Sequence, residues 1–237
     1  MLILLSVWLV ANFAPHILVF FVKKKICYQL NTMWIMLTES SIMLLNLLLP
    51  VLVLLPRKDH IFQGLGWRWG GWHTMWIGLI GFVVFIAIAL VSQRTIGAPL
   101  SSSGRQISSH EFIMTSTLLL VLTPAAEETM FRGYIQTALT RSYGVWIGIG
   151  GTALLFGLRH LPMDLYNGIV QRAPSSAWLS RMLQLYIGAL LFGIVRHWAG
   201  STWASWIMHE SIMMVIVGLN SRSLRKEGVS AQSLRGG

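Results

Sequence analysis

The sequence predicts an all-α membrane protein, a polytopic bundle of about seven transmembrane helices. Hydrophobic residues make up 54% of the chain, charged residues make up 11%, and the mean hydropathy is +0.64. Soluble domains carry about 25% charged residues, so this chain lacks the polar surface of a soluble globule, and lipid must cover the rest. Long apolar runs also recur, and about 20 residues of helix cross a hydrocarbon core roughly 30 Å thick.

Seven apolar runs are expected to span the membrane, with turn and charge signals between them. The expected spans are 2–22, 32–55, 74–91, 112–131 (continuing as helix to about Leu139), 145–160, 179–195 and 201–219. The basic cluster 23–25 follows the first apolar run instead of preceding it, so a retained span is expected there and not a cleaved signal peptide. We expect one membrane-embedded domain over 1–219 and a basic, disordered tail over 220–237.

The formal net charge is +10, but the basic residues lie mostly between apolar runs. Membrane topology and anionic headgroups explain this pattern better than nucleic acid does, so we expect a lipid bilayer and no nucleic acid as partner. The loops after the first, third and fifth spans, together with the tail, hold most of the basic residues. The positive-inside rule then predicts a cytosolic C-terminus, and the plasma membrane is the expected location. Cys27 is the single cysteine, which excludes an intramolecular disulfide.

Tryptophans gather in segment 61–73, where Trp67, Trp69 and Trp72 lie close together in the sequence. Tryptophan favours the headgroup zone, because its ring can be half buried while its N–H is solvated. We therefore expect an interfacial stretch, and an aromatic platform for substrate is the alternative.

Ionisable residues inside the spans are the candidates for function, since a charge at the centre of a membrane helix costs at least about 2.5–3.5 kcal/mol. They are Glu39, Glu127, Glu128, Arg132, Arg159, His160, His209 and Glu210. Glu128 and Arg132 are four residues apart and are expected to pair on one helix face. Glu127 points about 100° away, so we expect it to have no cation beside it and to act as a general base on water. The alternative is that both acids only tie helices together through buried ion pairs.

Two histidines accompany these acids. Phe156 and His160 lie one turn apart on one face, and His160 can orient water, shuttle a proton or bind metal. The alternative for His160 is an ordinary histidine at a helix end near the interface. His209 lies near the middle of the last span, where a histidine without partners is costly. His16 has no acidic neighbour in the sequence and is interpreted as structural.

Three motifs in this order resemble those of one family: Glu-Glu-x-x-x-Arg at 127–132, Phe-x-x-x-His at 156–160, and the later His209. They are similar to the motifs of the CPBP family, the type II CAAX prenyl protease and bacteriocin-processing group also called Abi. Residues 200–206 are similar to the family's lead-in to its last histidine. The resemblance covers roughly residues 111–219, the expected protease core.

The resemblance implies an intramembrane endopeptidase that cleaves a membrane-associated peptide, CAAX-like or other, with glutamate-activated water. It implies that Glu127 activates the water together with His160, that Glu128 and Arg132 hold the helix and polarise the site, and that His209 helps to stabilise the oxyanion. No cofactor is expected. The alternative is a zinc ion at Glu127, His160 and His209. The implied partner is a peptide or protein substrate at the membrane.

One position departs from the family pattern. The family usually has Asn or Asp four residues after the last histidine, and here Met213 stands in that place. Methionine cannot donate a hydrogen bond to an oxyanion, and loss of one such donor can cost roughly 10²–10³ in rate. A catalytically impaired homologue that serves as a membrane immunity or scaffolding protein is therefore the alternative function. A transporter with a proton relay is disfavoured, because no internal repeat is visible.

Overall fold

The computed structural model describes residues 2–26, 32–57, 61–96, 116–162 and 175–233, and every regular element in these ranges is helical. The all-α prediction is therefore confirmed over this part of the chain. The long helices are α1 (Leu2–Ile26), α2 (Thr32–Leu54), α4 (Trp72–Ile96), α8 (Val145–Arg159), α10 (Ser175–Ala199) and α11 (Thr202–Ser233). The shorter segments are η1 (Leu55–Arg57), α3 (Ile61–Gly64), η2 (Leu118–Leu122), α6 (Thr123–Glu127), η3 (Glu128–Ile135) and α7 (Gln136–Tyr143).

Among the described residues, four helices are long and apolar enough to cross a membrane, which supports a membrane protein. They contain the segments Leu37–Leu54, Trp72–Ser92, Arg181–Ala199 and Thr202–Leu219. Of the other three predicted spans, two are shorter apolar helices in their described parts, Leu2–Ile17 and Val145–Arg159. The span expected over 112–131 is divided among several helical segments from residue 116 on. The count of seven therefore stays a prediction.

The disorder expected from residue 220 stays a prediction, although the structure continues α11 as helix to Ser233. The reason for this continuation lies in local composition. Residues 220–227 contain neither proline nor glycine, and their Leu, Arg, Lys and Glu residues are good helix formers. A polar, basic segment can continue a helix that an apolar segment has already nucleated.

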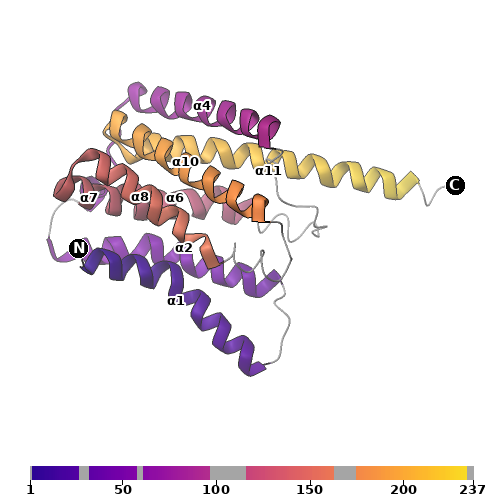
Figure 1. The fold of residues 1–237 in the computed structure, drawn as a ribbon, viewed down its shortest axis with the longest axis horizontal. Coiled ribbons are helices and arrows are strands. Elements are labelled where there is room, and N and C mark those ends of the chain that lie inside the picture. Colours follow the sequence, from indigo (N-terminus) through magenta and orange to yellow (C-terminus); the bar gives the residue numbers. More distant parts are fainter. Residues whose placement is uncertain (1, 27–31, 58–60, 97–115, 163–174, 234–237) are drawn as a thin grey trace.

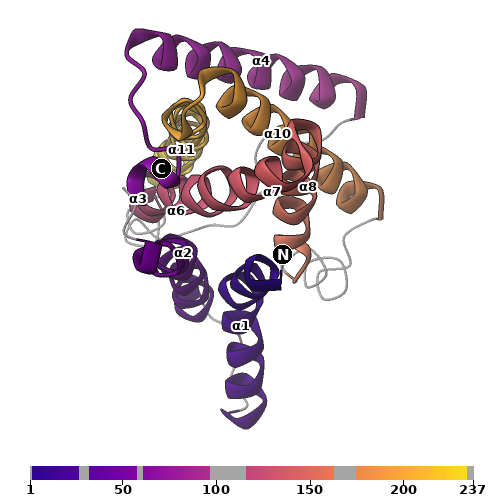
Figure 2. The same cartoon turned by 90° about the vertical axis from the view of Figure 1, so that its left-hand side faces the viewer.

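The helices pack in layers around the segment that runs from η2 to α7. Figure 1 shows α4 on one side of the molecule, followed by α10 and α11, then α6, α7 and α8, and finally α2 and α1. In the end-on view of Figure 2, α6 and α7 cross the middle between these outer layers. α4 packs on α10 and α11, α8 packs on α10 and α7, and α1 pairs with α2. The acids predicted at 127 and 128 therefore lie in the innermost layer.

Polar and small residues set the contacts between these helices. Asn12 and Asn46 are fully buried and exchange side-chain hydrogen bonds of 3.2 and 3.1 Å between α1 and α2. Gly78 in α4 lies so close to α11 that a Cβ atom there would be 2.6 Å from the carbonyl oxygen of Ala204. Small residues and side-chain amides of this kind hold membrane helices together, because lipid gives no hydrophobic drive between them.

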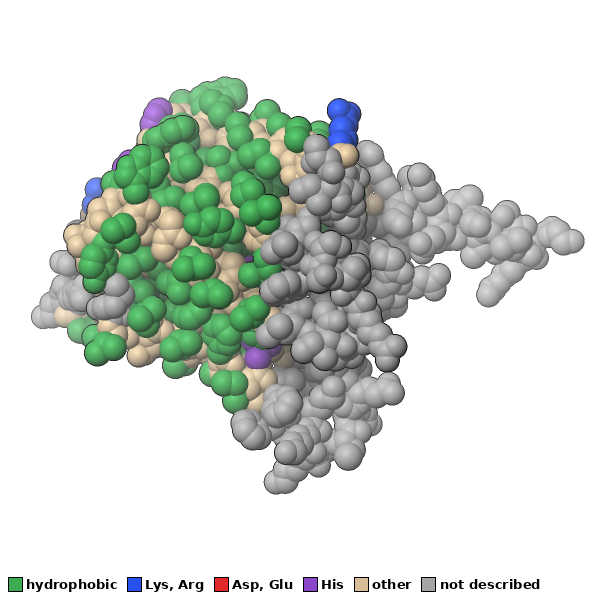
Figure 3. Space-filling model, viewed as in Figure 1, with side chains coloured by type: hydrophobic (Ala, Val, Ile, Leu, Met, Phe, Trp, Pro, Cys, Tyr) green, Lys and Arg blue, Asp and Glu red, His purple; other side chains and the backbone are tan. Residues whose placement is uncertain are grey.

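The outer faces of the bundle are apolar. Large hydrophobic side chains such as Ile80 and Val83 of α4 are about 60% exposed, and Figure 3 shows hydrophobic side chains over most of the described part of one face. Surfaces this apolar are rare on soluble monomers. They fit contact with lipid acyl chains, in keeping with the apolar spans.

Replacement of Gly78 by Ala should lower the thermal stability of the detergent-solubilised protein, at a cost of about 1–3 kcal/mol, because the new methyl group forces α4 away from α11. Thermal unfolding followed by circular dichroism measures the effect. Gly150→Ala in α8 is the matched control, since a Cβ atom there meets nothing within 4 Å. Equal losses of stability in the two variants would contradict the close contact.

Candidate active site

The central segment does not form the plain α-helix that the sequence predicts. Its backbone passes from π-helical turns in η2 to the short helix α6, and again to π-helical turns in η3. Pro124 lies at the start of α6 and has no N–H to donate. π-helical turns interrupt α-helices mostly at functional sites. Glu127 ends α6 and Glu128 begins η3, so the two acids lie where the helical geometry changes.

Glu128 and Arg132 form the predicted pair. Arg132 Nη1 lies 3.3 Å from Glu128 Oε1, and both side chains are fully buried. The same Oε1 atom lies 3.0 Å from His209 Nδ1 on α11. The second oxygen, Oε2, has no hydrogen-bond partner among the described residues. Glu128 therefore joins η3 to α11 and keeps one acceptor atom unused.

Arg132 is enclosed by aromatic rings. Its guanidinium carbon lies 4.9 Å from the ring centre of Phe156 on α8 and 4.7 Å from that of Phe192 on α10. Its Nη2 atom donates a hydrogen bond of 3.3 Å to the carbonyl oxygen of Ala189. Cation–π contacts are strongest where the cation is desolvated, so these rings help to retain a charged arginine in the core.

The sequence predicts that Glu127 has no cation beside it, and this prediction is wrong: Glu127 is paired with Arg159 of α8. Arg159 Nη1 donates a hydrogen bond to Glu127 Oε1, and its Nη2 atom lies 3.8 Å from Glu39 Oε2 on α2. Glu127 and Arg159 are about 95% buried, whereas 31% of the Glu39 side chain is exposed. Sequence analysis noticed Arg159 and Glu39 as ionisable residues within spans but did not place them in the site. The physical reason is that the spacing of residues in the sequence predicts contacts within one helix, whereas these pairs join different helices.

His209 lies between the two glutamates. Its Nδ1 atom faces Glu128 at 3.0 Å and its Nε2 atom lies 3.9 Å from Glu127 Oε2. The ring also packs on Phe192 with the ring centres 5.0 Å apart. The imidazole is 4% exposed, so the two carboxylates are the partners that a buried histidine needs. The structure thus brings Glu127, Glu128, Arg132 and His209 together.

His160 occupies the end of α8, directly after Arg159, and is half buried. Its Nδ1 atom is 3.0 Å from the carbonyl oxygen of Phe156, and the two rings lie 5.1 Å apart. A carbonyl oxygen only accepts, so Nδ1 carries the proton, and in the neutral ring Nε2 keeps its lone pair. No hydrogen bond between His160 and Glu127 is among the described contacts. The fifth predicted residue therefore borders the site without a direct bond to the base.

Together these residues form a continuous polar network, here called the central cluster. It consists of Glu39, Glu127, Glu128, Arg132, Arg159 and His209. Three carboxylates face two guanidinium groups, so the cluster carries one net negative charge when His209 is neutral. One additional proton makes it neutral. In apolar surroundings, charged groups are more stable when their charges sum to zero. The cluster is therefore suited to accept a proton.

The described residues contain no group of three or more His, Cys, Asp or Glu side chains arranged to hold a metal ion. The zinc alternative stays a prediction that a chelator experiment can test.

The segment that contains most of the central cluster matches a known protein family. Residues 109–215 match the family model for Rce1-like proteins, described as type II CAAX prenyl endopeptidase Rce1-like. This range contains every residue of the central cluster except Glu39, and it contains His160. Neither a curated protein nor a solved structure matches the chain. The match confirms the family that the three motifs resemble.

A double-mutant cycle should show strong coupling between Arg159 and Glu127. Arg159→Gln leaves a buried carboxylate without its cation, which typically costs about 3–5 kcal/mol, while the double variant with Glu127→Gln should recover about 0.5–3 kcal/mol of that loss. Unfolding of the purified protein in mixed detergent micelles measures both values. The cycle of Arg159 with Glu39→Gln is the control, because the partly exposed pair at 3.8 Å should couple by at most about 1 kcal/mol. A larger coupling with Glu39 than with Glu127 would contradict the described pairing.

Proposed function

We propose that this chain, whose residues 109–215 belong to the Rce1-like family of type II CAAX prenyl endopeptidases, is an intramembrane endopeptidase that uses glutamate-activated water. The observation that carries the proposal is the placement of His209 between two buried glutamates at the centre of a membrane bundle. The family is a protease family, and hydrolysis of a peptide bond requires a base for water and donors for the developing negative charge. The central cluster contains both kinds of group.

Glu127 is the proposed general base. Arg159 occupies its Oε1 atom, so Oε2 is the oxygen that remains for water. Oε2 and His209 Nε2 lie 3.9 Å apart, and a water molecule beside the line that joins them can hydrogen-bond to both at about 2.8 Å. Arg159 thus orients the carboxylate, and His209 helps to place the water.

The proposed reaction follows from this arrangement. The water oxygen bonds to the peptide carbonyl carbon while Glu127 takes one water proton. Donors of the cluster stabilise the oxyanion, and His209 donates to it from Nε2 when the imidazole is protonated, because Nδ1 already faces Glu128. The C–N bond then breaks, and the proton held by Glu127 passes to the leaving nitrogen, which gives a carboxylic acid and an amine; transfer of the acid's remaining proton to the amine gives a carboxylate and an ammonium group. His160 has its Nε2 lone pair available and serves as a second proton carrier for the amine. Glu128 and Arg132 hold His209 in its orientation.

The proposed substrate is a peptide that reaches the cluster from the membrane, such as a prenylated CAAX tail or another membrane-associated peptide. The apolar outer faces of the bundle support substrate arrival through lipid. We further propose that the protein lies in the plasma membrane with its C-terminus in the cytosol, because basic residues favour that side.

Met213 is the observation that favours a second candidate, a homologue that binds its peptide without cutting it. Its half-buried side chain packs on the apolar cluster formed by Phe192, Val195, Ala204, Met208 and Ile212. Methionine there supplies no hydrogen-bond donor. The complete set of Glu127, His209 and Arg159 weighs against this candidate, since binding alone does not require a base oriented toward water.

Replacement of Glu127 by Gln or Ala should lower cleavage of a quenched fluorescent peptide by about 10²–10⁴-fold, because the base is lost. The assay uses purified protein in detergent and compares a farnesylated peptide ending in a CAAX sequence with the same peptide without the lipid. His209→Ala and His160→Ala should also abolish turnover while expression survives. Glu210→Gln is the matched control, an acid of α11 with no described bond to the cluster.

Turnover that persists in Glu127→Gln would show that Glu127 is not the general base. The same assay tests the zinc alternative, since chelators such as 1,10-phenanthroline should leave the rate unchanged if the cluster works without metal. A loss that added zinc restores would favour a metal at Glu127, His160 and His209.

Replacement of Met213 by Asn should increase the rate constant for cleavage, because the new amide lies one turn from His209 and can donate to the oxyanion. Met213→Leu is the control for the change in packing, since it preserves the apolar contacts. Equal rates in the wild type and the Asn variant would show that another donor already stabilises the oxyanion.

A further inference from the structure

A cationic pocket lies at one end of the bundle, away from the central cluster. Its volume is about 280 Å³, and it is lined by Gln63, Gly64, Gly66, Arg68, Thr137, Thr140, Arg141, Arg196 and Gly200. These residues come from three segments: α3 with the link that follows it, the helix α7, and the end of α10 with the turn that follows it. Thr137 follows Glu127 by ten residues, which is about 15 Å along a helix. The pocket is therefore separate from the proposed catalytic site.

The pocket lies at the membrane surface. The apolar spans Trp72–Ser92 and Thr202–Leu219 begin there, and Arg181–Ala199 ends there. Tryptophans flank the lining residues in the sequence: Trp67 and Trp69 lie on either side of Arg68, and both pack edge-on against Trp203, which in turn packs against Trp206. Trp198, two residues from Arg196, is 70% exposed. Tryptophans concentrate at the level of lipid headgroups, so the pocket opens at that level.

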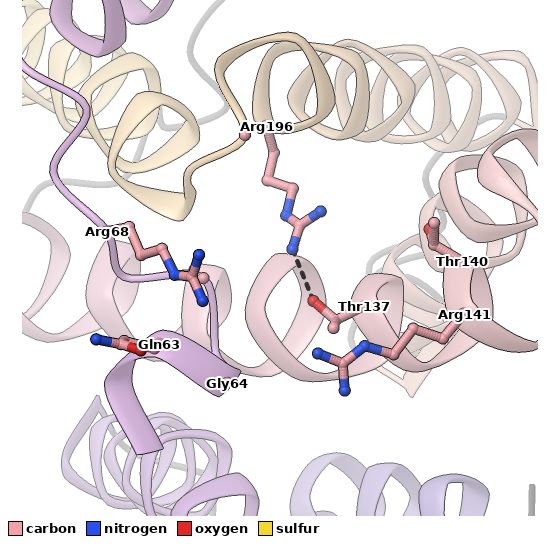
Figure 4. A pocket seen from close by; sticks show the side chains of 9 residues that line it. Gln63, Gly64, Arg68, Thr137, Thr140, Arg141 and Arg196 are labelled. Atoms are coloured by element: carbon pink, nitrogen blue, oxygen red, sulfur yellow. Dashed lines mark hydrogen bonds between the residues drawn. The ribbon is translucent and has the colours of Figure 1, made fainter. Parts of the chain in front are cut away.

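Three arginines of the pocket have no acidic partner among the described residues. Figure 4 shows the guanidinium groups of Arg68, Arg141 and Arg196 pointing into the same space. Arg196 Nη2 donates to Thr137 Oγ1 at 2.7 Å, and its buried Nε atom has no hydrogen-bond partner. Like charges gathered in this way repel one another, and an anion in the space between them relieves the repulsion.

The wall of the pocket is fixed in place. Thr202 donates from its backbone N–H to the carbonyl oxygen of Gly66 and from Oγ1 to that of Leu65, both at 2.8 Å. Gly66 has φ of +72°, and a Cβ atom there would lie 2.8 Å from Thr202 Oγ1 and 3.2 Å from Arg196 Nη2. Glycine thus leaves room around the Arg196 guanidinium group that any other residue would fill.

We propose that this pocket binds a phosphate group, either in the headgroup of an anionic lipid or as free phosphate. Phosphate offers several oxygens and up to two charges, and it suits several arginines and threonine hydroxyls at once. A peptide carboxylate has two oxygens and is matched by one arginine, so three arginines favour phosphate. The tryptophans around the opening favour lipid as the carrier. The proposal stands on binding alone and does not depend on the proposed protease activity.

The test measures ligand-dependent thermal stabilisation of purified protein in an uncharged detergent. The ligands are dioctanoyl phosphatidic acid, inorganic phosphate, the zwitterionic dioctanoyl phosphatidylcholine, and a short peptide with a free C-terminal carboxylate. Phosphatidic acid should raise the unfolding temperature of the wild type with a saturable dependence on concentration. Arg68→Gln and Arg141→Gln should each weaken its apparent affinity about tenfold or more, the usual effect of losing a charged hydrogen bond. Both side chains are exposed, so these variants should fold.

The control is Arg94→Gln, which removes an exposed arginine in the last turn of α4, outside the pocket. It should bind phosphatidic acid as the wild type does. Saturable binding of inorganic phosphate that depends on Arg68 and Arg141 identifies free phosphate as a sufficient ligand, whereas binding of the lipid alone identifies the headgroup. Equal affinity in the pocket variants and the control, no binding of either phosphate, or preferential binding of the peptide carboxylate would each overturn the proposal.

Discussion

The rest of the structure depends on the neutralisation of charges inside an apolar bundle. Glu127 and Glu128 are adjacent in sequence, and in lipid each requires its own partner. Arg159 of α8 pairs with Glu127, and Arg132 of η3 pairs with Glu128. His209 of α11 contacts both glutamates. These bonds fix the rotation of three helices about their axes. The apolar side chains then fill the space that the polar contacts leave, as Phe156 and Phe192 do on either side of Arg132.

The irregular backbone of the central segment follows from the same constraint. Two adjacent acids on one helix point about 100° apart, so the helices that carry their partners must approach from different sides. α8 reaches Glu127, and α11 lies where the two nitrogen atoms of one imidazole can face both acids. The change from α6 to π-helical turns occurs between Glu127 and Glu128. The segment thereby serves as the axis around which the layers in Figure 2 are placed.

Sequence reasoning predicted what is local or compositional. The helical class follows from apolar runs, the Glu128–Arg132 pair from four-residue spacing, and the need of His209 for polar partners from the cost of a polar group in a span. It missed the bond between Arg159 and Glu127, because these residues are 32 positions apart and only the packing of α8 on the central segment joins them. The cationic pocket was not predicted for the same reason, since its arginines come from three separate segments of the chain. The polarity of the tail predicts disorder, whereas its helix-forming residues allow α11 to continue to Ser233.

The reciprocal bonds between Asn12 and Asn46 have a consequence for biogenesis. Each amide satisfies the other inside the bundle, and Asn12 also donates to the carbonyl oxygen of Trp8 in its own helix. Either helix alone in the hydrocarbon core would lose the amide pairing between the helices, so their joint entry lowers the cost of insertion. The two helices are therefore expected to be released into the bilayer together, as a hairpin whose register the two asparagines have already set.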